Sequence, residues 1–304
     1  DSMSDNLVQS KWKGKTQGGD FGQRSLVFLI RIFGLRFMYF IMAFAIPFFV
    51  IFNRNERKAI VKYYHDICGF GKFRSFLRTF KNNFLFGKMM LDRLAIMAKK
   101  NKFSIKIVNE DLFENFCNDE KGFMIGSAHV GNFELAGYAL HQDKKKIHSL
   151  IFGGESPDIQ ARRLEILEKN NIVGIVASVD MSHIFKIKNA LDEGNIVSMP
   201  CDRMLGSNKS IKVSLLGKET SLPMGPFITA AHSDVKMISI FIMREKVWNY
   251  TVYVNEIQYD GSLNIRQRSE QLARNYAKEL ESVLRNYPDQ WFNFYDFWGE
   301  QKSL

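Results

Sequence analysis

The sequence predicts an α/β fold in which a layered sheet is flanked by helices, preceded by an N-terminal hydrophobic helix and basic amphipathic helices. From Phe103 onward, short apolar runs alternate with polar stretches of helical spacing, and such alternation is typical of layered α/β domains. An apolar segment and then a segment rich in Lys and Arg come before this part. At 304 residues the chain is long enough to bury a substantial core.

These changes in texture divide the chain into three parts. Residues 1–23 are polar and rich in Gly and Lys, with no apolar periodicity, which indicates an arm without a core of its own. Residues 24–102 form a membrane-anchoring and basic amphipathic helical region. Residues 103–304 form the α/β domain.

The hydrophobic segment covers residues 25–52 and is apolar apart from Arg31 and Arg36. Its uncharged part, Phe37–Phe52, has 16 residues and contains Pro47. A helix needs about 20 apolar residues to span a bilayer, so this length is borderline. Basic residues on both sides leave the orientation open. We predict a membrane anchor that either spans the bilayer or lies in its plane; a hairpin buried in the core is the alternative.

Basic charge is concentrated directly after this segment. Residues 54–102 contain 13 Lys and Arg against 3 Asp and Glu. Such a patch attracts anionic lipid, nucleic acid or an acidic carrier protein, and its position beside the apolar segment favours lipid and no nucleic acid. Within it, apolar residues recur at three- and four-residue steps over Lys72–Leu94. This predicts an amphipathic helix that either packs its Phe stripe on the main domain or lies on lipid headgroups.

Seven apolar runs in the last two thirds of the chain predict strands, several of them buried. They are Gly122–Ser127, Ile147–Phe152, Ile172–Val176, Ile196–Met199, Ile211–Leu215, Val235–Phe241 and Thr251–Ile257. Helical spacing is found over Ser156–Asn170, Ser182–Glu193 and Arg266–Tyr287.

Several common catalytic devices are absent from the sequence. It contains no Gly-x-Ser-x-Gly elbow, no Walker A loop and no His-Glu-x-x-His. The three cysteines are far apart, which predicts neither a disulfide framework nor a zinc site. We therefore expect no metal and no cofactor, and the run from Gly126 to Glu134 becomes the main candidate site.

His129 and Glu134 are the two residues of this run that could carry acid/base chemistry. His129 follows a predicted buried strand, whose carboxyl end is the usual place for an α/β site. Its imidazole could take a proton from a hydroxyl or amine, with Glu134 in the first turn of the next helix holding the ring. Gly131 allows a sharp turn, and free N–H groups at the helix start could stabilise an oxyanion. The spacing alone is a weak signal and favours a structural histidine that caps a strand end.

The run resembles the His-x4-Asp/Glu motif of the glycerolipid acyltransferases, and Ala128–Glu134 resembles the lipid A late acyltransferase branch in particular. Further blocks that resemble this branch follow in the same order: Met199–Arg203, Leu215–Lys218, Leu222–Pro226 and Tyr287–Trp291. The resemblance implies a glycerolipid-acyltransferase-like sheet. It also implies that His129 is the general base and Glu134 the carboxylate that orients it.

The resemblance also implies the substrates and the location. An acyl group would pass from an acyl carrier protein or coenzyme A thioester to a hydroxyl or amine on a membrane lipid or glycolipid acceptor, at the cytoplasmic face of a bacterial inner membrane. The residues expected to bind substrate are Gly131, Asn132, Asp202, Arg203, Pro223 and Gly225. Arg203 could bind a phosphate or the donor's phosphopantetheine arm through two hydrogen bonds, or form a plain surface ion pair.

Two departures from the family pattern limit these expectations. The segment Phe292–Trp298 replaces the usual Trp/His/Arg-containing segment, so the acceptor need not be a lipid A precursor. Residues 12–19 and 182–185 resemble a divergent subgroup of Bacteroidetes-type bacteria. Two other functions stay open, namely a lipid thioesterase or hydrolase that uses the same dyad and a non-catalytic basic protein that binds membranes or nucleic acid. Asp180 and His183 form a second possible acid/base pair, although the sequence favours Asp180 or Ser182 as the N-cap of the following helix.

Overall fold

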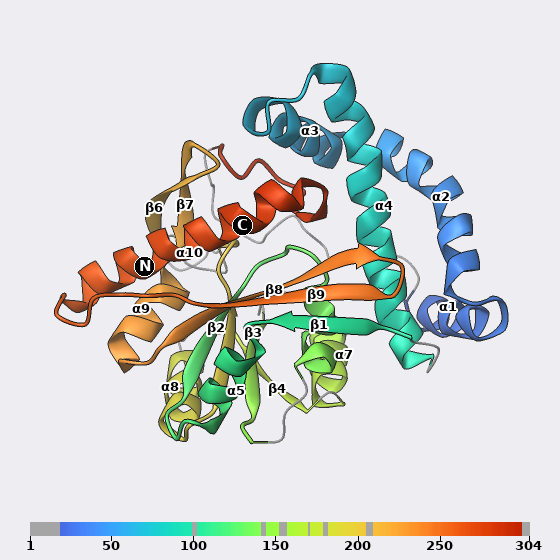
Figure 1. Cartoon of the computed structure of the whole chain (residues 1–304). Coiled ribbons are helices and arrows are strands. Elements are labelled where there is room, and N and C mark those ends of the chain that lie inside the picture. Colours follow the sequence, from blue (N-terminus) through green and yellow to red (C-terminus); the bar gives the residue numbers. More distant parts are fainter. Residues whose placement is uncertain are drawn as a thin grey trace, which may run out of the picture.

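The central element is a seven-stranded sheet with the strand order β1-β9-β8-β2-β5-β3-β4 (Figure 1). The structure is a computed structural model that describes residues 19–98, 102–140, 144–151, 157–169, 171–178, 182–204 and 209–299. The strands are β1 (Ser104–Val108), β2 (Phe123–Ser127), β3 (Ile147–Ile151), β4 (Ile172–Val176), β5 (Ile196–Pro200), β8 (Met237–Lys246) and β9 (Asn249–Glu256). Only β8 and β9 pair antiparallel. The predicted layered α/β fold is confirmed.

All seven predicted strands are present, and two further strands were missed. The run at 211–215 forms β6 (Ser210–Leu215), which pairs with β7 (Lys218–Pro223) in a separate hairpin. Leu216 and Gly217 connect them with positive φ angles of 53° and 79°, as a tight two-residue hairpin turn requires. The missed strands are rich in polar residues: β1 has them at alternate positions, and β7 begins with four in a row. Because the apolar signal is diluted, such short strands resemble loops in the sequence.

Helices cover both faces of the sheet. Successive side chains of β2 point to opposite faces, so its residues belong to two different cores. Met124 belongs to a core with α8 (Ser182–Asp192), α9 (Met224–Ser233) and α10 (Ile265–Asn286). Phe123 and Ile125 belong to a second core with α5 (Glu110–Asn118) and the short α6 (Ala136–Ala139). Helix α7 (Pro157–Glu168) packs beside the edge strand β4. The carboxyl end of β2 thus lies between two filled cores.

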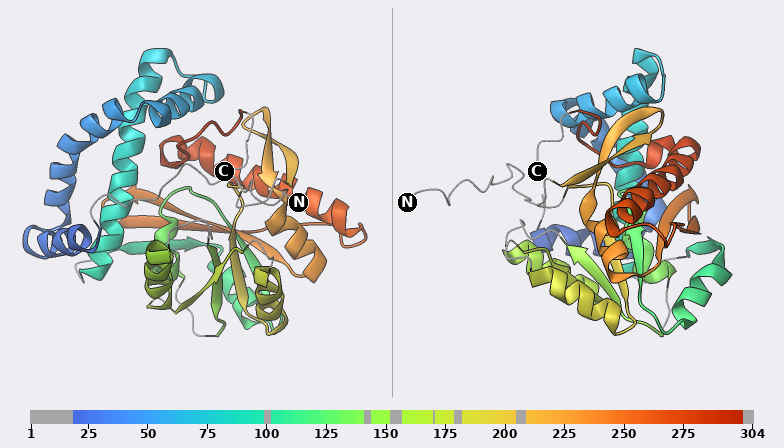
Figure 2. Two further views of the ribbon diagram at one scale, coloured as in Figure 1. Left: turned by 180° about the vertical axis from the view of Figure 1, so that it is seen from behind. Right: turned by 90° about the vertical axis from the view of Figure 1, so that its left-hand side faces the viewer.

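The N-terminal helices form a third unit beside the sheet. They are α1 (Gly19–Phe33), α2 (Leu35–Phe52), α3 (Arg54–Lys62), the π-helical turn η1 (Tyr63–Ile67) and α4 (Lys72–Met97). Helix α2 packs on α4 and lies at the periphery of the molecule (Figures 1 and 2). Residues 1–18 of the predicted polar arm lie outside the described residues, and residues 19–23 are already part of α1. The chain breaks between α1 and α2 at Gly34, whose φ is +80°.

Helix α2 exposes most of its apolar surface. It is the one helix among the described residues that is long and apolar enough to cross a membrane by length and composition, and only 22% of it is buried. Its exposed aromatic residues include Phe40, Phe44, Phe48 and Phe52. A hairpin buried in the core, which the sequence left possible, is therefore not what α2 forms.

The two halves of α4 pack differently. The first half buries small polar residues, namely Ser75, Thr79, Asn82 and Asn83, and leaves Phe73 76% exposed. The second half buries Leu91 and Leu94 against α1 and α2. The Phe stripe of the first half therefore does not pack on the main domain but faces outward, in the same N-terminal unit that exposes the aromatic side of α2.

Candidate active site

The sheet register brings His129 and Asp202 together. Strands β2 and β5 are parallel neighbours, and Ser127 pairs with Pro200 at their carboxyl ends. His129 and Asp202 each follow two residues later, on adjacent strand ends. The Nδ1 atom of His129 lies 2.9 Å from Oδ1 of Asp202, and the backbone N–H of His129 donates to Oδ2 at 2.8 Å. The Asp202 side chain is fully buried, whereas that of His129 is 22% exposed. The imidazole is therefore held from behind while part of its ring stays accessible.

The surroundings of Asp202 keep its carboxyl group ionised. Burial alone would raise its pKa, but the charge and hydrogen bonds of His129 and the nearby Arg203 outweigh burial and lower the pKa below its ordinary range. Trp291 Nε1 also donates to Oδ2, at 3.4 Å. An ionised carboxylate only accepts hydrogen bonds, so in the neutral imidazole the proton sits on Nδ1. The Nε2 atom is then free to act as a proton acceptor.

The backbone of the loop after His129 is fixed on both sides. Gly131 has a φ of +61° and donates its N–H to Gln290 O at 2.8 Å. Asn132 N–H donates to Ile242 O at 2.7 Å, and Phe292 N–H donates to His129 O at 2.9 Å. The predicted sharp turn at Gly131 is confirmed. Because the N–H groups of residues 129, 131 and 132 are all used, a backbone oxyanion site would need the N–H of Val130 or N–H groups from Phe133 onward.

Replacing Gly131 with alanine is expected to disrupt this turn. A Cβ atom there would lie 2.1 Å from Ile242 O, and alanine at positive φ costs about 1–2 kcal/mol before any clash is counted. We expect the free energy of unfolding to fall by more than about 2 kcal/mol and acyl transfer to be lost. Urea denaturation measures the first effect. The control is Gly261→Ala, where no atom lies within 4 Å of the added Cβ; equal stability of the two variants would contradict the prediction.

A buried polar network connects this loop to the N-terminal helices. The side-chain amide of Asn132 donates to the Tyr250 hydroxyl at 3.0 Å, and Tyr250 donates to the Asp92 carboxylate on α4. Tyr39 of α2 donates to the same carboxylate, and Arg244 Nε does so at 3.3 Å. Asn132 is 1% exposed. Its side chain is thus engaged in the interior, and contact with substrate stays a prediction.

The segment after α10 clamps α4 against the sheet. The side chain of Gln290, the last residue of the short helix η3 (Pro288–Gln290), bonds the backbone N–H and C=O of Arg244 at 3.0 and 2.8 Å. Asn82 of α4 donates to the carbonyls of Asp289 and Trp291 at 3.1 and 2.9 Å. This clamp places Trp291 against Asp202. In the sequence the segment was noticed only as a family-like block, and no periodicity revealed its structural role.

Asp289 makes this clamp sensitive to acid. Its side chain is 8% exposed and pairs with Arg78 and Lys81 at 2.5 Å each. Burial would raise its pKa, but the two cations outweigh burial and lower it. A lowered folded-state pKa means that the stabilisation is complete above the unfolded value of about 3.9 and is lost as the pH falls through the folded value.

We therefore expect Asp289→Asn to lower the free energy of unfolding at pH 7 by about 1.5–3 kcal/mol. The difference from wild type should shrink below pH 4, because the wild-type carboxylate then becomes protonated. Urea denaturation at pH 7 and pH 3 checks this. The matched control is Asp234→Asn, whose carboxylate pairs with Arg268 at an exposed position and should contribute little. A difference that is the same at both pH values would contradict the expectation.

The other predicted site residues lie at different distances from this centre. Arg203 follows Asp202 directly; its guanidinium donates to Phe292 O at 3.2 Å, and its buried Nε has no hydrogen bond within the described part of the chain. Pro223 and Gly225 lie at the junction of β7 and α9, and no described contact joins them to His129. Glu134 lies in the short helix η2 (Phe133–Leu135), but its side chain is outside the described part. Its orienting role stays a prediction.

The second acid/base pair considered in the sequence stays a prediction. Asp180 lies outside the described residues. Nδ1 of His183 accepts a hydrogen bond from the Ser178 N–H at 3.1 Å, at the start of α8. The hydroxyl of Ser178 lies 3.0 Å from that of Ser182. His183 thus orders the turn that leads into the helix.

Comparison with known proteins identifies the family. The family described as bacterial lipid A biosynthesis acyltransferase matches residues 72–299, three quarters of the chain. The chain belongs to this family. It is an acyltransferase of the lipid A and glycerolipid type, and its matched part includes His129 and Asp202 at adjacent strand ends.

Two further comparisons accompany this finding. A crystal structure of the 1-acyl-sn-glycerophosphate (LPA) acyltransferase from Thermotoga maritima is similar over 86% of this chain and 98% of that chain, with 10% identity and a TM-score of 0.35. The search of curated proteins found no match to this chain.

Proposed function

We propose that this acyltransferase moves a fatty acyl group from a thioester of acyl carrier protein or coenzyme A to a hydroxyl or amine of a membrane lipid or lipid-like acceptor, with His129 as general base. The observation that carries the proposal is the contact of His129 Nδ1 with the buried, ionised Asp202 at 2.9 Å. A carboxylate behind an imidazole fixes the tautomer and stabilises the imidazolium that forms during proton transfer.

The reaction needs one proton to move twice. Nε2 of His129 takes the proton from the hydroxyl or amine of the acceptor, and the acceptor's oxygen or nitrogen attacks the thioester carbonyl at the same time. The resulting oxyanion collapses, the carbon–sulfur bond breaks, and the imidazolium returns the proton to the leaving thiolate. Asp202 carries the compensating charge throughout. Arg203, with a buried Nε lacking a hydrogen bond in the described structure, is suited to the oxyanion or to a phosphate of the donor.

Glu134 has a place in the proposal beside Asp202. Its backbone lies five residues from His129 in η2, so its carboxylate can share in orienting the imidazole or in meeting the incoming acceptor amine or hydroxyl. Gly131 and Asn132 fix the loop between the two residues. Pro223 and Gly225 could meet the donor only if the β7–α9 junction faces the bound thioester.

A membrane surface at the cytoplasmic face of a bacterial inner membrane is the proposed location. The exposed aromatic side of α2 and the outward-facing Phe73 of α4 support it, because such contiguous apolar surface is rare on proteins surrounded by water. The 13 basic residues of 54–102 would lie close to anionic headgroups and to an acidic carrier protein.

Product analysis tests the proposal. Purified protein in vesicles of phosphatidylethanolamine and phosphatidylglycerol would receive radiolabelled palmitoyl-coenzyme A or palmitoyl carrier protein, with or without a lipid extract from cells that lack the gene. We expect label in an acylated lipid only when the extract is present. Label that appears as free fatty acid in both cases would favour a thioesterase, and no consumption of either donor would contradict the proposal.

A further inference from the structure

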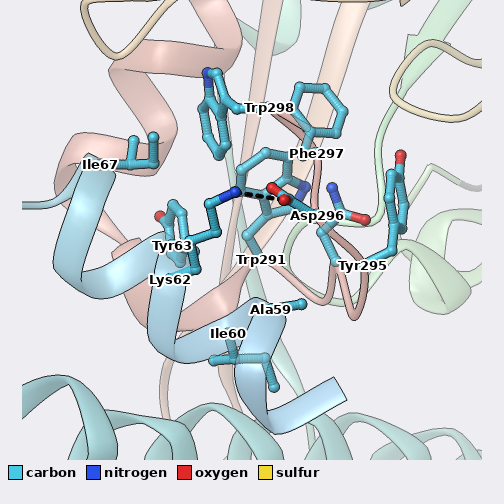
Figure 3. A pocket seen from close by; sticks show the side chains of 11 residues that line it. Ala59, Ile60, Lys62, Tyr63, Ile67, Trp291, Tyr295, Asp296, Phe297 and Trp298 are labelled. Carbon is cyan, nitrogen blue, oxygen red and sulfur yellow. Dashed lines mark hydrogen bonds and ion pairs between the residues drawn. The ribbon is translucent and has the colours of Figure 1, made fainter. Parts of the chain in front are cut away.

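A pocket lined by aromatic residues includes Trp291 and Tyr295, two residues that hydrogen-bond to Asp202. It is formed by the end of α3, the turn η1 and the C-terminal segment 291–298 (Figure 3). Tyr63 stacks parallel to Trp298 with 6.1 Å between ring centroids and meets Trp291 edge-on at 5.3 Å. Tyr63 is also the first residue of a π-helical turn, a feature that occurs frequently at functional sites.

Two of the residues that line the pocket also form hydrogen bonds to Asp202. The indole N–H of Trp291 donates to Asp202 Oδ2 at 3.4 Å, and the Tyr295 hydroxyl donates to Asp202 O at 3.0 Å. Both rings also line the pocket. A group bound there would therefore be one side chain away from the carboxylate that holds His129.

Polar atoms in the pocket walls lack partners. Neither amide atom of Asn293, which is 7% exposed, makes a hydrogen bond of ordinary geometry to any described residue, and the same holds for the indole N–H of Trp298. The Tyr63 hydroxyl is buried too, and its side-chain partner among the described residues is the Cys68 thiol, a weak hydrogen-bonding group. Native proteins leave few buried polar groups unpaired because each costs free energy. These donors and acceptors are therefore suited to a ligand that carries both.

Size and charge narrow the class of that ligand. The free space between the side chains fits about one water-sized group. Two of the lining residues are charged, Lys62 and Asp296, and they pair with each other at the mouth (Figure 3). The walls thus offer no cation for a phosphate, which normally requires Arg or Lys. A single hydroxyl or amide group fits both the space and the unpaired atoms.

We propose that this pocket is the subsite for the acceptor's head group and that it takes an uncharged hydroxyl or amide beside the group to be acylated. The inference rests on the proposed acyl transfer. Five of its walls belong to Asn293–Trp298, inside the segment that departs from the family pattern. In this proposal the segment Phe292–Trp298 determines which class of acceptor binds, while His129 and Asp202 keep the same role in the chemistry.

Two variants with matched controls test the subsite. Asn293→Leu removes both amide atoms at similar volume, and Trp298→Phe removes the indole N–H. The controls are Asn286→Leu at the exposed end of α10 and Trp248→Phe beside Phe103, both outside the pocket. The assay measures transfer from palmitoyl thioester to the lipid extract of cells that lack the gene. Circular dichroism and thermal unfolding check the fold of each variant.

We expect each pocket variant to raise the apparent KM for the extract about tenfold, the effect of one lost hydrogen bond, with kcat and the donor's KM close to wild type. Monooleoylglycerol, a hydroxyl probe, or oleamide, an amide probe, should compete with the extract better than oleoyl lysophosphatidate does. The probe that competes more strongly shows whether the pocket prefers a hydroxyl or an amide group.

The outcomes separate the two proposals. If wild type acylates the extract but the pocket variants match their controls, the subsite is overturned and acyl transfer stands. Stronger competition by lysophosphatidate would also overturn the subsite, since its phosphate is charged. If wild type consumes neither thioester, the proposed acyl transfer itself fails.

Discussion

Replacing His129 with alanine is expected to reduce acyl transfer by about 10²–10⁴-fold, the usual contribution of a general base. The side chain is partly exposed, and among the described residues its side-chain hydrogen bond is to Asp202. Its removal should therefore leave the fold intact while the proposed acceptor of the substrate's proton is lost. The measurement is the rate of label transfer from palmitoyl thioester to acceptor lipid under saturating donor.

The matched control for this variant is His232→Ala. His232 lies at the exposed end of α9, away from the strand ends that form the site. It should retain the wild-type rate and the wild-type unfolding midpoint. Turnover retained in His129→Ala, or lost equally in the control, would remove His129 from the chemistry.

Replacing Asp202 with asparagine should reduce kcat by about 10²-fold or more. The amide keeps the shape of the side chain but carries no charge, so the imidazolium loses its counter-ion. If the amide nitrogen faces Nδ1, it also forces the proton of the neutral ring onto Nε2, where it blocks the base. The KM values should change little, because Asp202 is fully buried behind His129.

Comparison with Glu134→Gln separates the two carboxylates. If Asp202 holds the ring as the 2.9 Å contact indicates, its variant should lose more of kcat than Glu134→Gln, and the double variant should lose less than the product of both single effects. A wild-type kcat in Asp202→Asn would leave Glu134 as the only carboxylate that orients His129.

Much of the sheet could be predicted because its strands are apolar and short. Buried strands such as Phe123–Ser127 and Ile196–Pro200 are continuous apolar runs bounded by turn residues, so their existence follows from composition alone. Strands β1 and β7 contain several polar residues and therefore carried no such signal. The apolar segment at 25–52 was recognised, but its break at Gly34 into two helices depends on a single positive φ angle.

The candidate site was predicted in its parts but not in its pairing. His129 was placed at a strand end from the sequence, whereas Asp202 was assigned to substrate binding. Their contact depends on β2 and β5 being neighbours in register, and strand order is a long-range property that local patterns do not contain. The role of Trp291 was missed for the same reason, because it reaches Asp202 only through the clamp on α4.

The exposed Phe stripe of α4 shows a third limit of sequence reasoning. The apolar periodicity predicted a helix correctly, and it suggested an apolar face against the protein core. In the first half of α4 the small polar residues are the ones that pack, since Asn82 must reach the carbonyls of the C-terminal segment. Which face of an amphipathic helix is buried depends on what surrounds it, and a lipid surface reverses the usual rule.

Lipid analysis of cells tests the central claim most directly, namely that His129 drives acyl transfer to a lipid acceptor. Membrane lipids from cells that lack the gene would be compared by mass spectrometry after complementation with wild type, His129→Ala or His232→Ala. The account predicts that wild type and His232→Ala restore a lipid heavier by one acyl chain, while His129→Ala leaves only its lighter acceptor. The same acylated lipid in cells complemented with His129→Ala would contradict the account.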